Sequence, residues 1–554
     1  MKFLFIMHYP GYLRYFDSTV RELAAHGHNV ELLFDSPHKQ PEGIEALANA
    51  PDGIECLGRS PTRGDVWGPV SRAVRGAIDY ARYLDPSFVD APYLRRRMRA
   101  VLKPAFRFLG RFDTLGARSA RRVVSGLLSL ERAIPSSPMI EHFLRKRRPD
   151  ALIVSPLVTD QSPQVDWIKS AQAIGLPAAL CVASWDHLTT KGLMRIRPDL
   201  VAVWNETQRD EAVRYHDMAS DDIVVTGAQP FDRWFDREPS LDREAFCRKV
   251  GLRTDVPFVL FVGSTASISA PDAEIRFVRR WASMVRRRAV GTVDDIGVLV
   301  RPHPFNCAHW RDADLSDLQN VAVYPTDGAN PVDEGDRADY FDSLFHSAVV
   351  VGVNTSAMIE AAVVGRPVHT ILAREFEETQ QGTLHFRYLL PENGGFLRVA
   401  TNLDEHIDQL KATLAVPERD RERLKRFVRT FVRPYGADAA NTSRLVGALE
   451  MLASRAPCPG VRMSPAYYPL RLLLWTIGCL AVYRGDPDRR RRALRKAMKR
   501  GRQQVEQYLR HRRKRRAASL ASPRNTGTSR RRVVALRGFA SAKRKALWRL
   551  LVQR

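Results

Sequence analysis

The stretch AVVVGVNTSAMIEAAVVGRPVHTIL, residues 348–372, decides the fold. An apolar run at 348–353 is followed by a helical pattern at 356–364 and by a second apolar run at 368–372. Short apolar runs bounded by turn residues are typical of buried strands, and a helix between two such strands makes a βαβ unit. The segment therefore predicts one unit of a parallel sheet that is covered by helices.

The same alternation occurs in two separate series along the 554-residue chain. Two series of strands and helices, joined near 235–257, predict an α/β protein with two Rossmann-like parallel-sheet lobes that face a central cleft. The expected domains are a first lobe at 1–235, a second lobe at 236–454, and a linker, a short apolar helix and a basic helical tail at 455–554.

Two basic blocks account for the formal net charge of +26. Residues 484–554 contain 26 Lys and Arg against 3 Asp and Glu, and residues 59–148 contain 20 against 7. The second block is rich in aromatic residues and interrupts the first lobe as an inserted helical region. Because the rest of the chain is mildly acidic, the blocks favour docking to anionic membrane lipids or a polyanionic acceptor, and they argue against nucleic acid in the cleft.

The apolar segments and the cysteines indicate a location. The apolar run at 2–7 is too short for a signal peptide, and no run of about 20 apolar residues predicts a membrane-spanning helix. Residues 472–483 have the length of an interfacial or buried helix. The six cysteines lack CxxC spacing, which favours free thiols in a reducing compartment. We expect a cytoplasmic protein, associated peripherally with the inner face of the membrane.

Polar residues follow several predicted strands of the second lobe. Ligands of doubly wound sheets bind outside the carboxyl ends of the strands. Asn354, Thr355 and Ser356 stand between a strand and a helix, where backbone N–H groups and hydroxyls suit a diphosphate. Glu360, one turn further on, is placed to accept ribose hydroxyls. Gly263 and Ser264 end another strand of this lobe.

The segment Arg301-Pro302-His303-Pro304 follows an apolar strand. The two prolines restrict the backbone of this turn. Arg301 and His303 together can neutralise or protonate a leaving phosphate. The pattern therefore makes His303 a candidate catalytic residue and Arg301 a candidate donor-binding residue.

Two strand ends of the first lobe offer candidate bases. Asp186 follows the strand at 178–183 and can act as a general base on an acceptor hydroxyl. Thr190 and Lys191, just beyond it, can hold an anionic group. His8 ends the first strand and competes with Asp186 for the same role, and the residues alone do not decide between the two.

The two-lobed pattern, Arg301-Pro302-His303-Pro304 and residues 352–361 followed by Gly365-Arg366-Pro367-Val368 resemble the GT-B glycosyltransferase superfamily. Within it, the sequence is most similar to CDP-glycerol glycerophosphotransferase-like and capsule-polymer transferases. The resemblance covers roughly residues 1–58 and 149–450. It implies a nucleotide-activated donor bound mainly by the second lobe, an acceptor on the first, and no metal or other cofactor.

The resemblance also implies roles for single residues. It places Glu360 on the ribose, Thr355 and Ser356 on the diphosphate, and a catalytic histidine at His303. Further donor contacts are implied for Gln380 and Thr383. The sequence departs from the family where it has Val-Asn-Thr-Ser-Ala in place of a Thr-Asp-Tyr-Ser-Ser-type element, and where Gly352 stands at the position of the first glutamate of many retaining enzymes.

These observations predict a transferase of the cell envelope. It moves a glycosyl or glycerol-phosphate-like group from a nucleotide-activated donor to a cell-surface polymer or lipid-linked acceptor, as in polysaccharide biosynthesis. Two alternatives stay open. One is a non-hydrolysing UDP-sugar 2-epimerase, which shares the two-lobed architecture, and the other is a non-catalytic polyanion-binding protein.

Overall fold

The computed structural model describes residues 1–483 except 46, 48–51, 289–295, 457–459 and 462–463. The chain divides into two compact units, Met1–Ala481 and Val482–Arg554. The predicted basic tail at 484–554 lies outside the described residues.

The first lobe is built on a parallel sheet of seven strands in the order β3-β2-β1-β4-β5-β6-β7. In register, Lys2 pairs with Asn29 of β2, and Phe3 pairs with Ala151 of β4. The central strands are continuous apolar runs because helices cover both faces of the sheet. The strands are β1 (Lys2–Met7), β2 (Asn29–Phe34), β3 (Ile54–Arg59), β4 (Ala151–Ser155), β5 (Ala178–Cys181), β6 (Leu200–Val203) and β7 (Ile223–Val225).

The second lobe is built on a parallel sheet of six strands in the order β10-β9-β8-β11-β12-β13. The stretch 348–372 forms the expected βαβ unit, since β11 and β12 pair in parallel around α14. The strands are β8 (Phe258–Val262), β9 (Gly297–Arg301), β10 (Val321–Val323), β11 (Val349–Gly352), β12 (Val368–Ile371) and β13 (Arg398–Ala400). The predicted α/β class with two Rossmann-like parallel-sheet lobes is confirmed.

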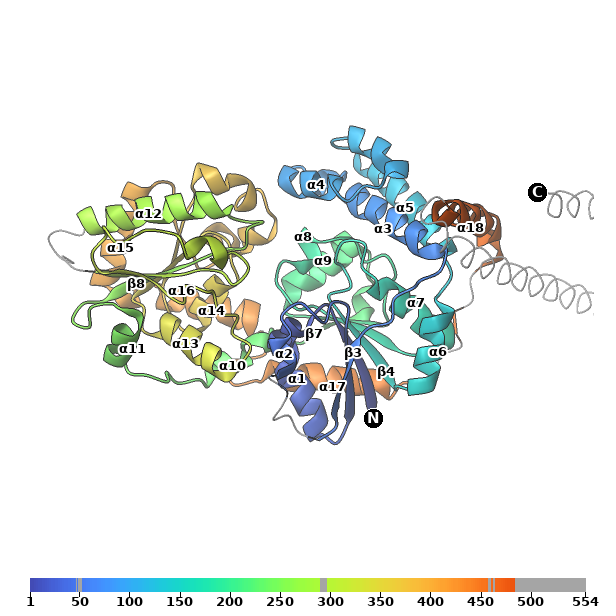
Figure 1. Ribbon diagram of the computed structural model, residues 1–554, viewed down its shortest axis with the longest axis horizontal. Helices are drawn as coiled ribbons and strands as arrows, with labels where there is room; N and C mark the ends of the chain where they lie inside the picture. The colour runs from blue at the N-terminus through green and yellow to red at the C-terminus, as the bar shows by residue number, and fades with distance from the viewer. Residues whose placement is uncertain (46, 48–51, 289–295, 457–459, 462–463, 484–554) are drawn as a thin grey trace, which may run out of the picture. The chain divides into compact units, whose positions relative to one another are not determined.

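Helices follow nearly every strand (Figure 1). Those of the first lobe are α1 (Leu13–Ala25), α2 (Glu42–Glu45), α7 (Gln164–Ile174), α8 (His187–Thr190) and α9 (Glu206–His216). Those that connect or cover the second sheet are α10 (Asp232–Phe235), α11 (Arg243–Val250), α12 (Pro271–Arg288), α13 (Glu334–Phe345), α14 (Ala357–Val363), α15 (Leu403–Ala415) and α16 (Arg421–Phe427).

The packing of α17 (Asn441–Ala453) corrects the predicted boundary at 454. This helix follows the second lobe in sequence, but it packs beside α1 against the first sheet (Figure 1). Leu445, Leu449 and Leu452 belong to the same buried cluster as Phe5 and Phe16. The apolar face of α17 fits either lobe by pattern, so only the tertiary contacts reveal that the chain returns to its first lobe.

The inserted region at 59–148 is helical, as expected. It contains α3 (Trp67–Arg82), α4 (Pro92–Arg99), α5 (Ala117–Ala133) and α6 (Pro138–Arg147). Its arginines are not all surface charges, because Arg75 and Arg82 are 1% and 4% exposed. Arg82 donates to the carbonyl oxygens of Lys191 and Gly192, at 2.9 and 2.8 Å. The insertion therefore supports the loop that carries the predicted residues Asp186 and Lys191.

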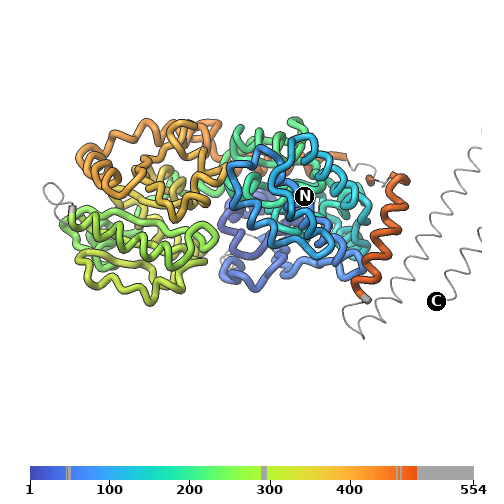
Figure 2. The backbone as a smooth tube through the Cα atoms, turned by 90° about the horizontal axis from the view of Figure 1, so that it is seen from above, coloured from blue at the N-terminus to red at the C-terminus, as the bar shows by residue number. Residues whose placement is uncertain are grey.

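The last described helix, α18 (Tyr468–Tyr483), contains the predicted apolar segment 472–483. One side lies against the first lobe, where Leu474 is 6% exposed and Arg471 Nε donates to the carbonyl oxygen of Ala133 at 3.0 Å. No helix among the described residues has the length and apolar character needed to cross a membrane. Figure 2 shows α18 in orange-red.

Candidate functional site

Two loops of the second lobe are joined by one buried carboxylate, that of Glu274 on α12. Its Oε1 accepts the backbone N–H of Ser264 at 2.8 Å, and its Oε2 accepts the side-chain amide of Asn306 at 3.2 Å. Asn306 also donates to the carbonyl oxygen of Ser264 at 3.2 Å. Burial raises the pKa of Glu274 to about 7. Glu274 and Asn306 thus hold together the loop after β8 and the loop after β9, which contains His303.

Gly263, at the end of β8, allows the two loops to approach each other because glycine has no side chain. A Cβ atom at this position would lie 2.8 Å from the backbone nitrogen of His303, which is closer than real Cβ contacts. Gly263 N–H donates to the carbonyl oxygen of Arg301 at 2.9 Å. The glycine therefore lets the backbone of the histidine loop lie directly against the end of β8.

His303 is a neutral hydrogen-bond donor in this arrangement. Its Nδ1 accepts the backbone N–H of Phe305 at 3.1 Å. Burial, helped by the nearby positive charge of Arg14, lowers the pKa of His303 to about 3. With Nδ1 accepting, the ring proton of the neutral form is on Nε2. His303 can therefore donate from Nε2 to an oxygen atom of a ligand.

Arg301 is anchored within the second lobe. It is 5% exposed, and its Nη1 donates to Ser343 Oγ on α13 at 2.9 Å. Its guanidinium lies 5.0 Å from the ring centroid of Tyr340. Its Nη2 has no hydrogen-bond partner among the described residues, and its role as a phosphate ligand stays a prediction.

Glu360 lies where the two lobes meet. It accepts from the hydroxyl of Tyr340, and it pairs with Arg14 Nη2 of α1 at 3.3 Å. Arg14 also donates to Asn330 Oδ1 at 3.3 Å. The carboxylate predicted to bind a ribose thus faces the first lobe and holds an arginine from it. Nothing in the sequence pattern of α1 distinguishes Arg14 from a surface arginine.

The remaining predicted donor residues divide into two groups. Thr355 and Ser356 are partly exposed. Asn354 is 4% exposed and donates to the carbonyl oxygen of Thr379 at 2.6 Å. Gln380 is 0% exposed and donates to three oxygen atoms within the lobe, while Thr383 Oγ1 donates to the carbonyl oxygen of Gln380. Gln380 and Thr383 therefore support the loop from inside, and their contact with the donor stays a prediction.

Asp186 is held by its own loop. It accepts from Ser184 Oγ at 2.6 Å and from Thr190 Oγ1 at 2.8 Å, and Lys191 Nζ lies 3.6 Å from it. Burial acts to raise the pKa of Asp186, but the charges of Lys191 and His187 hold it well below its usual value. A carboxylate of such low basicity is a weak general base. Asp186 is better suited to orient neighbouring groups, which changes the role that the sequence predicted.

Two imidazoles, those of His187 and His385, lie near this carboxylate, and a third, that of His8, lies near Asp35. His187 stacks on Tyr12, with ring centroids 6.4 Å apart, and His385 of the second lobe lies edge-on to Trp185, with centroids 4.6 Å apart. Burial lowers the pKa of His187 and of His385 to about 4. His8 is 3.8 Å from Asp35. The Nδ1 atoms of all three histidines have no hydrogen-bond partner among the described residues.

Two lysines bring positive charge to the same area. Lys39 Nζ lies 4.3 Å from the ring centroid of Tyr9 and 4.9 Å from that of Phe305, so it contacts an aromatic residue of each lobe. Burial lowers the pKa of Lys39, and the charge of Lys191 adds to this effect. Two cations within electrostatic reach of each other suit an anionic ligand.

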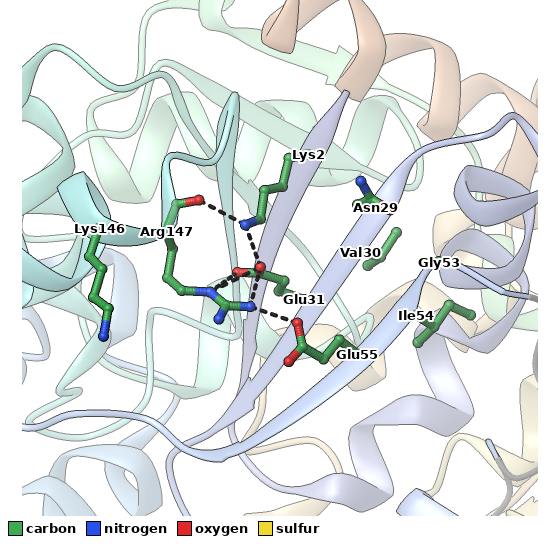
Figure 3. Close-up of a pocket in the computed structure, with 9 residues that line it drawn as sticks. All are labelled: Lys2, Asn29, Val30, Glu31, Gly53, Ile54, Glu55, Lys146 and Arg147. Atoms are coloured by element: carbon green, nitrogen blue, oxygen red, sulfur yellow. Dashed lines mark hydrogen bonds and ion pairs between the residues drawn. The ribbon is translucent and has the colours of Figure 1, made fainter.

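A separate hollow of about 400 Å³ lies at the amino ends of β1, β2 and β3 (Figure 3). Four of its charged groups pair with one another: Lys2 and Arg147 both pair with Glu31, and Arg147 also pairs with Glu55. None of its lining residues is a predicted site residue. Ligands of such sheets bind at the opposite, carboxyl edge, so we assign this hollow no role in the reaction.

Glu211 on α9 makes the protein's stability depend on pH. Burial raises its pKa to about 8, against the opposing effects of Tyr388 and Arg82, and Asp186 adds to the rise. Between about pH 4.5 and pH 8 the folded state keeps a proton that the unfolded state releases, so stability falls as pH rises. Replacing Glu211 with glutamine should make the decrease in the free energy of unfolding across this pH range smaller by a few kcal/mol. Urea denaturation at several pH values measures it.

The matched control is Glu206→Gln, at an exposed position of the same helix. Its pH profile of stability should follow that of the unaltered protein. If the Glu211→Gln profile also keeps the full slope across this range, Glu211 is not the group responsible.

Comparisons with known proteins give no close relative. No protein-family model matches the sequence, and no curated protein matches it. Among solved structures, the UDP-GlcNAc 2-epimerase from Methanocaldococcus jannaschii has 13% identity and a TM-score of 0.48, over 81% of this chain and 100% of that chain. The UDP-GlcNAc 2-epimerase from Neisseria meningitidis bound to UDP-GlcNAc has 11% identity and a TM-score of 0.46, over 81% and 100%.

A glycosyltransferase from Rickettsia africae has 10% identity and a TM-score of 0.47, over 82% of this chain and 99% of that chain. These likenesses are too distant to assign an activity. The fold assignment rests on the two sheets themselves, which have the two-lobed form that the GT-B resemblance implied. The narrower resemblance to glycerophosphotransferases and capsule-polymer transferases stays a prediction.

Proposed function

We propose that this protein is a transferase that moves a glycosyl or glycerol-phosphate-like group from a nucleotide-activated donor to a cell-surface polymer or lipid-linked acceptor. The observation that supports it best is the convergence of side chains from loops and helices that follow the carboxyl edges of both sheets. Glu360 reaches Arg14, His385 reaches Trp185, and Phe305 lies 6.5 Å from Tyr9 between ring centroids. Reactive side chains from two lobes thus share one interface.

The second lobe would hold the donor. Glu360 would release Arg14 and accept hydrogen bonds from the ribose hydroxyls instead. The partly exposed hydroxyls of Thr355 and Ser356 would contact the diphosphate. As the bond between the transferred group and the leaving phosphate breaks, negative charge grows on the phosphate oxygens. His303 would donate its Nε2 proton in a hydrogen bond to this charge, and the released Arg14 would add a cation.

The first lobe would prepare the acceptor. The attacking hydroxyl loses a proton as the new bond forms, and a neutral imidazole accepts it more readily than Asp186 does. His8 and His187 are the candidates on this lobe. Asp186 would fix the loop and stabilise the imidazolium that results. Lys39 and Lys191 favour an acceptor that carries a phosphate or carboxylate group near its hydroxyl.

Donor binding tests the proposal directly. We expect CDP-, UDP- or GDP-linked donors to bind the full chain in isothermal titration calorimetry, with one base preferred. Replacing Glu360 with glutamine should weaken the preferred donor by at least about tenfold, because a carboxylate accepts hydroxyl hydrogen bonds more strongly than an amide. The exposed Glu392→Gln is the matched control.

The outcomes also separate the alternatives. A UDP-sugar that is converted to its epimer without any acceptor would show an epimerase and contradict the transferase. Absence of binding by every nucleotide donor, with retained binding of a polyanion, would favour the polyanion-binding protein. Activity that needs added metal after treatment with chelator would contradict the expectation of a cofactor-free reaction.

We further propose that anionic membrane lipid is a partner, and that α18 contributes the apolar contact. Four large apolar side chains of this helix are 47–61% exposed: Leu472, Leu473, Ile477 and Leu480. At about 100° per residue these four side chains fall within about 140° of the helix circumference, beside the side that holds Leu474 against the first lobe. The sequence that follows carries the larger basic block. Apolar side chains next to cationic ones are typical of segments that lie in a membrane interface.

Vesicle binding tests this partner. Changing these four residues to serine should reduce sedimentation with phosphatidylglycerol-containing vesicles at least about fivefold, since each removes apolar area from the interface. Met451→Ser, at a 67% exposed position of α17, is the control. Equal sedimentation of the fourfold variant and the unaltered chain would show that α18 does not contribute to membrane binding. Equally strong binding to vesicles made only of neutral phosphatidylcholine would show that anionic lipid is not required.

A further inference from the structure

Three side chains of types that can ligate a metal meet at the amino edge of the first lobe. His26 Nδ1 and His28 Nε2 each lie 2.8 Å from the same oxygen atom, Oε1 of Glu450. The ligand atoms of all three residues lie within 4.8 Å of one another. His26 follows α1, His28 precedes β2, and Glu450 belongs to α17, more than 400 positions later in the chain. Figure 1 shows α1 and α17 side by side.

The backbone brings the two histidines to the same side. Gly27, between them, has φ of +78°, which is a left-handed conformation that favours glycine. The turn ends α1 and lets both rings approach the carboxylate. The ring of His28 is held further by the buried Phe3, with centroids 5.5 Å apart. The cluster is therefore positioned by its backbone and by core packing.

The two rings approach the carboxylate from different directions. Their planes are inclined by 77°, with centroids 6.2 Å apart. Two imidazoles thus converge on a single carboxylate oxygen atom. The side chains of His26, His28 and Glu450 are 47%, 13% and 28% exposed. One side of the cluster is thus supported by protein and the other is open to water.

We propose that His26, His28 and Glu450 form a binding site for a divalent transition-metal ion, with Zn²⁺ as the best match. Two imidazole nitrogens and one carboxylate oxygen are a ligand set that Zn²⁺ uses, with water in the fourth position. Mg²⁺ and Ca²⁺ prefer oxygen ligands alone and match the set poorly. Small side-chain movements bring the three atoms to ligand distances from one ion.

The ion would fasten the returning helix α17 to the end of α1. These two helices share the buried cluster that includes Val20, Leu23 and Leu449. The site is at the amino edge of the sheet, because His28 directly precedes β2, whereas His303 and Asp186 follow the carboxyl ends of their strands. The ion would therefore stabilise the first lobe without entering the proposed reaction, and the inference does not depend on that reaction.

Zinc titration of the full chain, prepared without a histidine tag and freed of metal with chelator, tests the site. We expect one Zn²⁺ to bind with a dissociation constant in the micromolar range or below, and the melting temperature to rise by a few degrees in excess zinc, because the ion binds only the folded state. Mg²⁺ in large excess should neither bind here nor raise the melting temperature.

Variants identify the ligands. Glu450→Gln keeps the size of the side chain and should weaken zinc at least about tenfold, as should His26→Ala. His142→Ala, at an exposed position on α6, should bind like the unaltered chain. Circular dichroism confirms that each variant folds, and the nearly isosteric Glu450→Gln gives a result even if His26→Ala does not fold. Zinc binding that is absent, or that is unchanged in both ligand variants, would overturn the proposal.

Discussion

Replacing Arg75 with alanine should lower the free energy of unfolding by about 3–5 kcal/mol. Arg75 on α3 is 1% exposed and forms two hydrogen bonds with Glu131 of α5 and two with Asp166 of α7. The guanidinium thus joins two helices of the insertion to a helix of the first lobe. Its removal leaves two buried carboxylates short of positive charge, and this costs more than the lost attraction alone.

The remaining cations only partly replace it. Lys169 stays 3.1 Å from Glu131, and Arg63 stays 2.8 Å from Asp166. Burial acts to raise the pKa of Asp166, but Arg75 and Arg63 hold it at about 2. Urea denaturation measures the effect. Arg72→Ala, at an exposed position of the same helix, should change stability by less than about 0.5 kcal/mol. Equal loss in both variants, or none in Arg75→Ala, would contradict this account.

Replacing His303 with alanine should reduce the rate of group transfer by about 10²- to 10⁴-fold, if the proposed function holds. The neutral ring donates from Nε2, and its hydrogen bond becomes stronger as charge develops on the leaving phosphate. An interaction that strengthens in the transition state affects kcat more than donor binding. We therefore expect kcat to fall while the dissociation constant of the donor, measured by calorimetry, changes little.

His309→Ala is the matched control, because His309 lies exposed in the same loop after β9. It should retain full activity. If His303→Ala loses donor binding and kcat together, His303 serves as a binding residue rather than as a donor to the transition state. If it loses neither, the assignment of His303 to the reaction is wrong, although the transferase activity itself can still stand.

The sequence predicted much of the fold because its signals are local. The run at 348–372 shows strand, helix and strand through the spacing of apolar residues, and the structure contains β11, α14 and β12 in that order. Strand ends are also local signals, so His303 and Asp186 were found as residues at the carboxyl edges of the sheets. The insertion at 59–148 was predicted to be helical from its composition, since it is rich in arginine with interleaved aromatic residues and interrupts the strand–helix alternation.

The roles of single side chains depended on partners that are distant in sequence. Arg301 and Gln380 follow or lie near strand ends, but their hydrogen bonds are made inside the second lobe. Asp186 has the position of a base, yet the charges gathered around it lower its pKa. The boundary at 454 was wrong for α17 because an amphipathic face does not specify which sheet it covers.

By itself, the sequence determined two α/β lobes, a basic insertion and the residues at the strand ends. These follow from hydrophobic periodicity, turn residues and charge, which act over a few positions. The tertiary structure alone decided that Arg14 meets Glu360, that α17 returns to the first lobe, and that His26 and His28 share Glu450. Such pairings join residues hundreds of positions apart, and their energies depend on burial and distance, which arise only when the chain has folded.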